Sequence, residues 1–209
     1  AVGDMNPARW SYEALCVNQF KNNRFNRHFF DLEQDISNNA YYSLLLIPRL
    51  QAITHEASSS IYSQKITSVT RNDLNLINKE IERLLEYPSL NQYKGKAANL
   101  EFNPTSISHK EIEQIESFLK EIRQVLQEKQ RDAIKKRDSI YVALTQLLGS
   151  DESVHALKRD YHNNALEDIM LGKNTVEKIA IYPHRIIRKY NLAHALPTSK
   201  SGRAHLFAP

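Results

Sequence analysis

Two glycine–lysine pairs are the first candidates for chemistry, because a nucleotide-binding P-loop ends in Gly-Lys followed by serine or threonine. The pairs are Gly95-Lys96 and Gly172-Lys173. Neither has a glycine five residues earlier, and neither is followed by serine or threonine. The chain also contains no Gly-x-Ser-x-Gly elbow and no His-Glu-x-x-His motif. We therefore expect no ATP hydrolysis by this chain, no catalytic residue and no bound cofactor.

The single cysteine, Cys16, and the eight histidines are the other residues suited to nucleophilic or metal chemistry. Cys16 lies in an apolar stretch, where cysteine behaves as a small hydrophobic residue, so we expect it to be packed or to face lipid. His155 with His162, and His28 with Asp31, are spaced to share a helix face. A metal ion usually needs three or four converging ligands, which no local spacing supplies. We expect structural or solvated histidines and no metal site.

A basic cluster on the second half of the chain contains Arg131, Lys135, Lys136 and Arg137, which could contact phosphates. Acidic residues interleave with the cluster, as on an ordinary solvated helix face. The whole chain has 28 Lys and Arg against 24 Asp and Glu, a formal net charge of only +4. The aromatic residues between positions 25 and 42 recur at helical spacing, which favours core packing over base stacking. We expect no nucleic-acid partner.

The composition predicts which elements position these residues. With 209 residues the chain can form one domain or two small ones with a sizeable core. Gly 5 and Pro 7 are few, which disfavours a turn-rich β-sandwich or barrel and favours helices. A lone cysteine excludes an intramolecular disulfide framework. The expected fold is all-α, an elongated bundle or hairpin of long antiparallel helices.

Hydrophobic periodicity places the helices and their ends. We expect helices over about 7–21, 25–36, 41–56, 73–84, 108–148, 151–171 and 175–190. Ser37-Asn38-Asn39 and Asn72 or Asp73 are expected caps, and Pro48 and Pro183 expected interruptions. Residues 57–71 are expected to be a frayed connection, and residues 88–104 a loop between two halves of the domain.

The strongest element is expected to begin at Ser106 or Ser108 and to end at Gly149. Its heptad positions are mostly apolar: Ile112, Ile115, Leu119, Ile122, Leu126, Lys129, Ala133, Lys136, Ile140, Ala143 and Leu147. Such a seam suits either an intermolecular coiled coil in a cytosolic scaffold protein or packing within the chain. We expect packing within the chain, because the stripe over residues 74–84 and the helix after Asp151 offer partners.

The N-terminal helix is less easily explained as ordinary core. Its residues Arg9, Trp10, Tyr12, Leu15 and Phe20 combine flat amphipathic rings with a cation, a combination that favours the boundary between water and lipid. Packing of this helix on the bundle is the alternative that composition leaves open. No apolar run is long enough to span a bilayer, and the chain has neither a starting methionine nor a signal peptide. We expect a soluble segment that starts within a longer protein or after processing.

Residues 6–20, NPARWSYEALCVNQF, resemble a stretch of the G-type (ABCG/White-like) ABC transporter permeases. The positions that fit are Arg9, Trp10, Tyr12, Ala14, Leu15, Asn18 and Phe20, whereas Gln19 stands where many members carry glutamate. Residues 21–30 look like bacterial relatives with an enlarged outer loop, and residues 203–209 resemble the segment before their last transmembrane helix. Animal members brace this loop with cysteines that the chain lacks, so their loop fold is not carried over.

The resemblance implies an extracytoplasmic loop domain between the last two transmembrane helices. Residues 1–23 would be a re-entrant or interfacial region, 24–196 a helical domain facing the periplasm, and 197–209 an exit linker. The parent transporter would lie in the bacterial inner membrane as a dimer, and its ATPase module would bind ATP and magnesium. Expected partners are the chain's own transmembrane and ATPase modules, the membrane surface and a periplasmic protein. Ala1 and Pro209 should then lie near each other.

Overall fold

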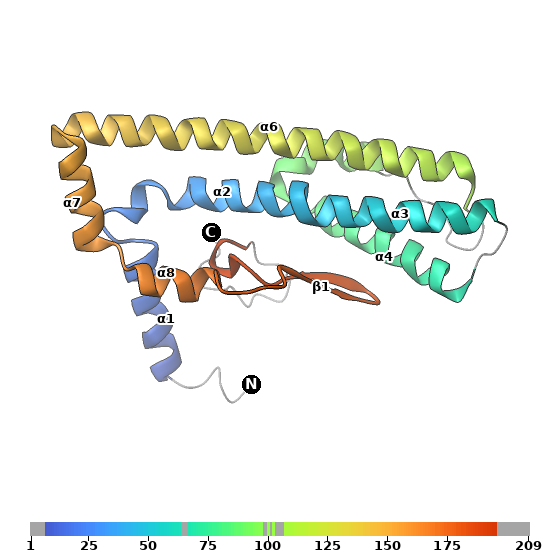
Figure 1. The fold of residues 1–209 in the computed structure, drawn as a ribbon, viewed down its shortest axis with the longest axis horizontal. Helices are drawn as coiled ribbons and strands as arrows, with labels where there is room; N and C mark the ends of the chain where they lie inside the picture. The colour runs from blue at the N-terminus through green and yellow to red at the C-terminus, as the bar shows by residue number, and fades with distance from the viewer. Residues whose placement is uncertain (1–6, 64–66, 98–99, 101, 103–106, 196–209) are drawn as a thin grey trace. The chain divides into compact units, whose positions relative to one another are not determined.

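The computed structural model describes residues 7–63, 67–97, 100, 102 and 107–195, which are mostly helical (Figure 1). The predicted all-α class is confirmed. The chain forms two compact units. Unit 1 contains residues 1–38, 129–176 and 189–209, and unit 2 contains residues 39–128 and 177–188. The expected boundary near residue 23 lies inside unit 1. In the part of the chain described here, no helix is both long and apolar enough to cross a bilayer.

Unit 2 is built on the helices α3 (Ile47–Tyr62) and α4 (Ser68–Leu84), which run in opposite directions (Figure 1). The 3₁₀ helix η4 (Pro88–Tyr93) and the short α5 (Lys94–Ala97) follow α4. Fully buried aliphatic side chains form the core: Ile47, Leu50, Leu74, Ile77, Leu84, Leu90, Ile112, Ile115, Leu119, Ile122 and Leu126. The expected loop over 88–104 therefore contains η4 and α5, and among its described residues Leu90 and Phe102 are buried.

The connection between α3 and α4 differs from the expected frayed segment over 57–71. Helix α3 continues to Tyr62, because Ala57 and Ser58 are buried on its inner face. The predicted caps of α4, Asn72 and Asp73, are wrong. The cap is Thr67, whose hydroxyl oxygen accepts a hydrogen bond from the backbone N–H of Thr70 at 3.2 Å. This bond satisfies one of the N–H groups that the first turn of any helix leaves unpaired.

Helix α2 (Phe30–Tyr41) passes through a π-helical turn (Tyr42–Leu46) directly into α3. The cap predicted at Ser37-Asn38-Asn39 is wrong, because these side chains are buried inside the helical run. The Asn39 side-chain oxygen accepts a hydrogen bond from the hydroxyl of Tyr87 at 3.2 Å. Its polar group is therefore paired inside the protein. Pro48 lies in the first turn of α3, after the wide turn. Proline has no N–H to donate to a preceding turn, which accounts for the irregularity there.

Helix α6 (His109–Leu148) is the long helix that the heptad pattern predicts, with 40 residues. Ser108 and Glu111 form a reciprocal cap. Glu111 accepts from the Ser108 backbone N–H at 2.6 Å, and the Ser108 hydroxyl accepts from the Glu111 N–H at 3.3 Å. At the other end, Gly149 adopts a positive φ of 88°, which a residue with a side chain rarely adopts.

The heptad pattern fails in the second half of α6. Ala143 and Leu147 are exposed, with Leu147 80% accessible, whereas Leu144 is buried. A straight α-helix has 3.6 residues per turn, so a strict heptad pattern drifts around it by about 20° per repeat. After several repeats the buried face has moved by one residue.

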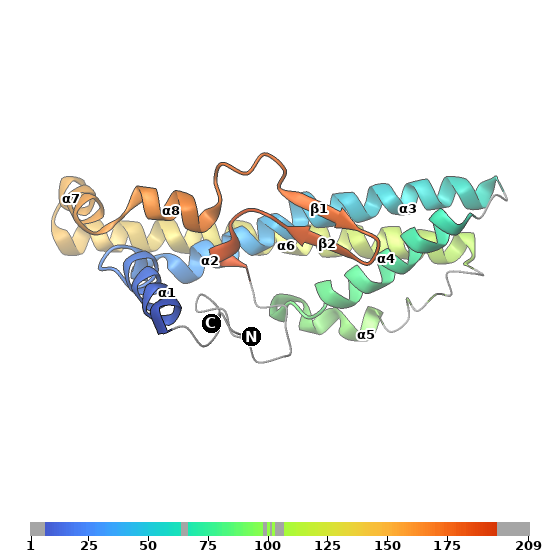
Figure 2. The ribbon, with the colours of Figure 1, turned by 90° about the horizontal axis from the view of Figure 1, so that it is seen from below.

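A β-hairpin replaces the helix expected over residues 175–190 (Figure 2). Strands β1 (Ile179–Tyr182) and β2 (Arg185–Arg188) pair in antiparallel register, with Tyr182 opposite Arg185. Glu80 of α4 accepts a hydrogen bond from the backbone N–H of Ile186 at 2.9 Å and forms an ion pair with Arg83. The β-branched isoleucines suit a strand, and Pro183 suits a turn.

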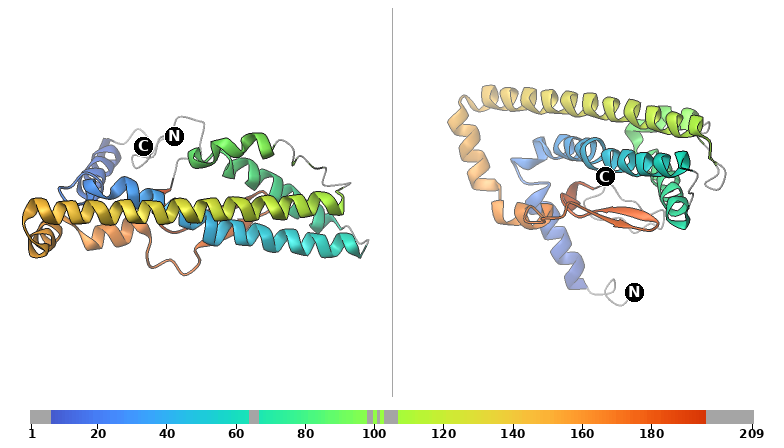
Figure 3. Two further views of the ribbon diagram at one scale, coloured as in Figure 1. Left: turned by 90° about the horizontal axis from the view of Figure 1, so that it is seen from above. Right: turned by 45° about the vertical axis from the view of Figure 1, so that its right-hand side comes forward.

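Unit 1 contains α1 (Pro7–Phe20), the 3₁₀ turns η2 (Asn26–His28) and η6 (Leu192–His194), and the helices α7 (Asp151–Tyr161) and α8 (Asn164–Leu171). The prediction of one helix over 151–171 is wrong, since α7 and α8 run in different directions (Figure 3). Asn163 caps α8 by accepting from the Leu166 N–H at 3.0 Å. The expected stop at Gly172 is confirmed by its left-handed backbone.

Candidate membrane-facing site on the first helix

The site residues predicted from the sequence lie on α1, and the structure places them differently. Tyr12 and Leu15 are exposed, with 63% and 52% of their surface accessible. Phe20 is buried, with 4% accessible. Arg9 and Trp10 belong to α1 by their backbone, and their side chains lie outside what the structure describes. The exposed apolar surface of the described α1 residues therefore includes Tyr12 and Leu15 but not Phe20.

Phe20 anchors the C-terminal end of α1 in the core of unit 1. Its ring meets the ring of Phe30 edge-on at 5.9 Å between centroids, and the same cluster includes Leu171 and Ala193. One turn earlier, Cys16 is buried with 5% of its surface accessible, so its expected role as a packed small residue is confirmed. Helix α1 is thus held at its C-terminal end, whereas its described side chains from Ser11 to Leu15 are exposed.

Tyr12 also interacts with Cys16, one turn further along α1. The hydrogen bond between the two side chains, together with the proximity of the thiol group, raises the pKa of Tyr12 above its ordinary value of 10.0. The phenol therefore stays neutral at physiological pH. A neutral, exposed tyrosine beside an exposed leucine is the kind of pair that lies well at an interface between water and apolar material.

Two asparagines fix the direction in which α1 leaves the core. The Asn23 side-chain oxygen accepts from the backbone N–H of Asn26 at 2.7 Å, and its amide donates to the carbonyl of Gln19 at 2.7 Å. The Asn26 amide donates to the carbonyl of Phe20 at 2.7 Å. These bonds satisfy carbonyl groups that the last turn of a helix leaves unpaired. The predicted helix ends at about residue 21, close to Asn23, but no signal in the sequence indicated the role of Asn26.

The two histidines expected on one helix face, His155 and His162, lie in different surroundings. His155 is exposed on α7, whereas the His162 side chain is 8% exposed and lies in the junction between α7 and α8. The His162 ring nitrogens face Asn26 Oδ1 and Glu167 Oε2, both at 2.9 Å. This ring therefore joins the junction to η2. Within the described residues, no three His, Cys, Asp or Glu side chains gather closely enough to hold a metal ion.

The expectation that Ala1 and Pro209 lie close together falls outside the described residues. The described segments nearest to them, α1 and η6, belong to unit 1 and pack together. The rings of Phe20 and His194 are 6.1 Å apart, and Phe30 packs against His194 at 5.3 Å. The C-terminal end of α1 and η6 thus belong to one cluster of unit 1. No family model, no curated protein and no solved structure matches this chain.

Proposed function

We propose that the chain is a non-catalytic extracytoplasmic domain of a bacterial G-type ABC transporter, located between its last two transmembrane helices. In this proposal α1 rests on the outer surface of the inner membrane and the rest of the chain faces the periplasm. The observation that carries it is the exposure of Tyr12 and Leu15 on the helix whose sequence resembles the transporter family. A helix that is held at its C-terminal end and exposes Tyr12 and Leu15 offers apolar side chains that a bilayer surface would cover.

The packing of α1 against η6 supports the same proposal. A loop between two neighbouring transmembrane helices must leave and re-enter the membrane at nearby points. The contact of Phe20 with Ala193 and His194 joins the C-terminal end of α1 to η6 within unit 1. If α1 and η6 belonged to different units, nothing in the structure would support nearby points of exit from and entry into the membrane.

In the parent transporter, ATP and magnesium would be bound by an ATPase module elsewhere in the polypeptide, and the transporter would be a dimer. The domain would then act in gating, in substrate passage or in docking of a periplasmic partner. The alternative of a cytosolic coiled-coil scaffold has less support. The apolar seam of α6 from Ile112 to Leu126 is buried within the chain, so a second chain would have to displace the core to use it.

Binding of the full chain to phospholipid vesicles tests the proposal. Trp10 is the only tryptophan in the chain, so its fluorescence reports on α1 directly. We expect co-sedimentation with phosphatidylethanolamine–phosphatidylglycerol vesicles and a blue shift of the emission. The double variant Tyr12→Asp, Leu15→Asp should bind at least about tenfold more weakly, because each buried apolar side chain contributes about 1.5–3 kcal/mol.

Leu147→Asp is the matched control, because Leu147 is more exposed than Leu15 and lies on another helix. It should bind vesicles as well as the unchanged protein. Equal binding by the double variant, or no binding by the unchanged chain, would contradict a membrane-facing α1. The coding sequence on either side of this segment offers a second test, in which an upstream ATPase module and flanking apolar runs are expected.

A further inference from the structure

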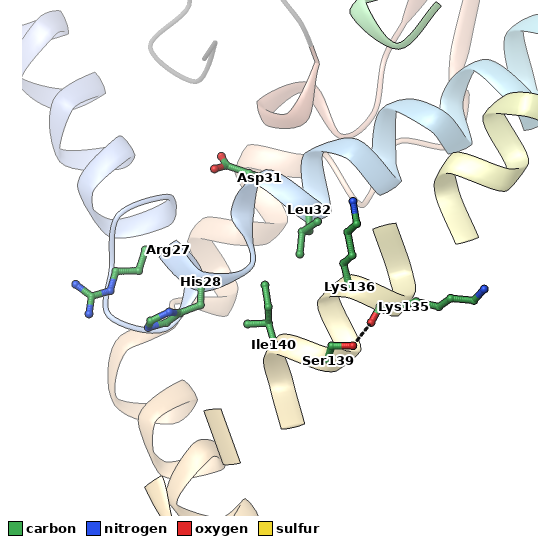
Figure 4. Close-up of a pocket in the computed structure, with 8 residues that line it drawn as sticks. All are labelled: Arg27, His28, Asp31, Leu32, Lys135, Lys136, Ser139 and Ile140. Carbon is green, nitrogen blue, oxygen red and sulfur yellow. Dashed lines mark hydrogen bonds between the residues drawn. The ribbon is translucent and has the colours of Figure 1, made fainter. Parts of the chain in front are cut away.

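Unit 1 contains a depression of about 580 Å³ between η2, the start of α2 and the second half of α6, but its cations do not meet at one point. Figure 4 shows the Arg27 and Lys135 side chains pointing away from the depression on opposite sides, and Lys136 lies near Asp35. A surface whose binding groups point the same way lies in unit 2, along one edge of the β-hairpin.

The backbone groups of the hairpin alternate in direction. In an antiparallel pair, every second pair of residues turns its N–H and C=O groups away from the partner strand. The Ile186 N–H points away from β1, because it donates to Glu80 of α4 at 2.9 Å. Ile186 lies opposite Ile181, and two residues further along Arg188 lies opposite Ile179. Ile179 and Ile181 therefore turn their backbone groups toward the outer edge of β1.

Helix α4 covers the outer edge of β2 and leaves that of β1 open. Besides the bond to Glu80, Arg83 of α4 donates to the carbonyl of His184 in the hairpin turn at 3.1 Å. Figure 2 shows β2 on the side of α4 and β1 on the far side. Among the described residues, no hydrogen-bond partner meets the outward N–H and C=O groups of Ile179 and Ile181. An open strand edge of this kind is a template for a further strand.

The hairpin is already held in place, so a partner would not have to order it. Ile186 is buried, and the guanidinium group of Arg188 lies over the ring of Tyr41, 5.1 Å from its centroid. On β1, Ile181 and Tyr182 are exposed, with 45% and 52% of their surface accessible. An added strand would cover part of this apolar surface, and its backbone hydrogen bonds would fix its register.

The charges around the open edge decide which kind of strand suits it. Lys178 and Arg185 are exposed near the two ends of β1, and Glu177 is the one carboxylate in the sequence from 177 to 188. Two copies of β1 paired along their open edges would bring the same cations together, and like charges on adjacent strands are destabilising. An acidic strand would instead meet charges of opposite sign.

We propose that the open edge of β1 binds an extended acidic segment of another protein as a third strand. The backbone groups of Ile179 and Ile181 would bond to the segment, and Lys178 and Arg185 would pair with its carboxylates. The apolar side chains of the segment would pack on Ile181 and Tyr182. The inference does not depend on the transporter assignment, because it uses contacts within unit 2 alone, and a failure of lipid binding would leave it unaffected.

Titration of the full chain with the blocked peptide Glu-Val-Thr-Val-Thr-Glu, followed by amide NMR, tests this inference. At saturation the hydrogen exchange of the Ile179 and Ile181 amides should slow by at least about tenfold, because the added strand would bond them. The same peptide with lysine in place of each glutamate should bind at least about tenfold more weakly. No change in exchange at millimolar peptide, or equal affinity for the two peptides, would overturn the proposal.

Ile181→Pro removes one outward N–H but no hydrogen bond within the hairpin, so it should weaken binding of the acidic peptide by at least about tenfold. Ile181→Val is the matched control, because it keeps the N–H and loses one partly exposed methyl group. It should bind within about threefold of the unchanged protein. Equal binding by the two variants would contradict pairing along this edge.

A charge-reversed variant keeps the proposal testable if proline disturbs the hairpin. Lys178→Glu, Arg185→Glu leaves the backbone unchanged and should bind the lysine peptide more tightly than the glutamate peptide. An unchanged preference for the glutamate peptide would contradict the role of the two cations. Sedimentation equilibrium covers the other occupant: a dimer of the unchanged chain that Ile181→Pro dissociates would assign the edge to a second copy and overturn the proposal.

Discussion

The cores of the two units are made of different side chains. In unit 2 the largest fully buried side chains are aliphatic, and α6 contributes five of them between Ile112 and Leu126. The unit also contains one aromatic cluster, formed by Tyr41, Tyr42 and Tyr87. In unit 1 phenylalanine and histidine rings dominate, with centroid distances between 5.1 and 6.3 Å in the clusters around Phe20 and Phe25. Asparagine side chains hold the ends of its helices. Unit 2 thus has the larger aliphatic core, and ring contacts make up more of the core of unit 1.

The two halves of α6 show the consequence of this difference along one helix. The first half presents a continuous apolar stripe to unit 2. The second half belongs to unit 1, buries Ala133 and Leu144, and leaves Lys135, Lys136 and Leu147 exposed. We expect the half with the larger apolar stripe to contribute more to stability, whereas the second half leaves its lysines exposed. The same helix therefore serves stability at one end and an accessible surface at the other.

Truncation of Leu119 should produce the largest effect. Leu119 has none of its surface accessible, so Leu119→Ala should lower the free energy of unfolding by about 3 kcal/mol through lost burial and the cavity it leaves. Urea denaturation followed by circular dichroism measures the change. Leu147→Ala, on the second half of the same helix, should change stability by less than about 0.5 kcal/mol.

The pair works as a test because both positions belong to the same predicted heptad seam. Equal destabilisation by the two substitutions would mean that the second half of α6 is also packed along that seam. The contrast between the units would then be lost. A large effect at Leu147 together with a small one at Leu119 would reverse it.

Removal of the Asn26 side chain should produce an effect of intermediate size. In unit 1 this amide bonds the carbonyl of Phe20 and the His162 ring. Asn26→Ala should lower the free energy of unfolding by about 2 kcal/mol, because it leaves a largely buried imidazole nitrogen and a helix-end carbonyl without these partners. Asn18→Ala, at an exposed position of α1, is the control and should be nearly neutral.

A double-mutant cycle sharpens the interpretation. If Asn26 acts through His162, then Asn26→Ala and His162→Ala together should cost clearly less than the sum of their separate effects. Additive effects would mean that the two residues stabilise unit 1 independently. Unit 1 would then lack the directional coupling that distinguishes it from unit 2.

The sequence could predict the parts of the fold that local signals determine. The long helix α6, its Ser108 cap and the stops at Gly149 and Gly172 follow from periodicity and from residues that favour helix ends. The hairpin over 179–188 could not be predicted in this way. Its isoleucines suit a short helix or a strand, and the group that holds β2 is Glu80, 106 positions away along the chain. The hydrogen bond to Glu80 favours the strand over the helix, and the local sequence does not reveal it.

Part of the candidate site on α1 could also be predicted from the sequence. Tyr12, Cys16 and Phe20 are spaced four residues apart, so the sequence places them along one stripe of α1. It cannot tell how far along the stripe the core extends. The structure shows that Phe20 and Cys16 are buried and that Tyr12, one turn nearer the N-terminus, is exposed. The depression of unit 1 between η2, the start of α2 and the second half of α6 depends on contacts between segments far apart in the chain, which spacing along the chain does not reveal.

The smallest expected effect concerns the cap where the aliphatic half of α6 begins. Hydrogen bonds from the side chain and backbone of Ser108 lower the pKa of Glu111 below its ordinary value of 4.5. The charged carboxylate therefore stabilises the folded state above that value, and this contribution disappears as the pH falls through the lowered pKa. The stability advantage of the unchanged protein over Glu111→Gln should be constant from pH 7 to about pH 5 and shrink at lower pH.

Urea denaturation at a series of pH values measures this difference, and Glu128→Gln on the exposed face of α6 is the control. Glutamine keeps a side-chain acceptor for the Ser108 N–H, so the comparison isolates the charge. An advantage that grows on acidification would mean that protonation strengthens the cap. Since the lowered pKa requires the opposite sign, that result would contradict the capping geometry at the start of α6, and the aliphatic half of the helix would then rely on burial alone.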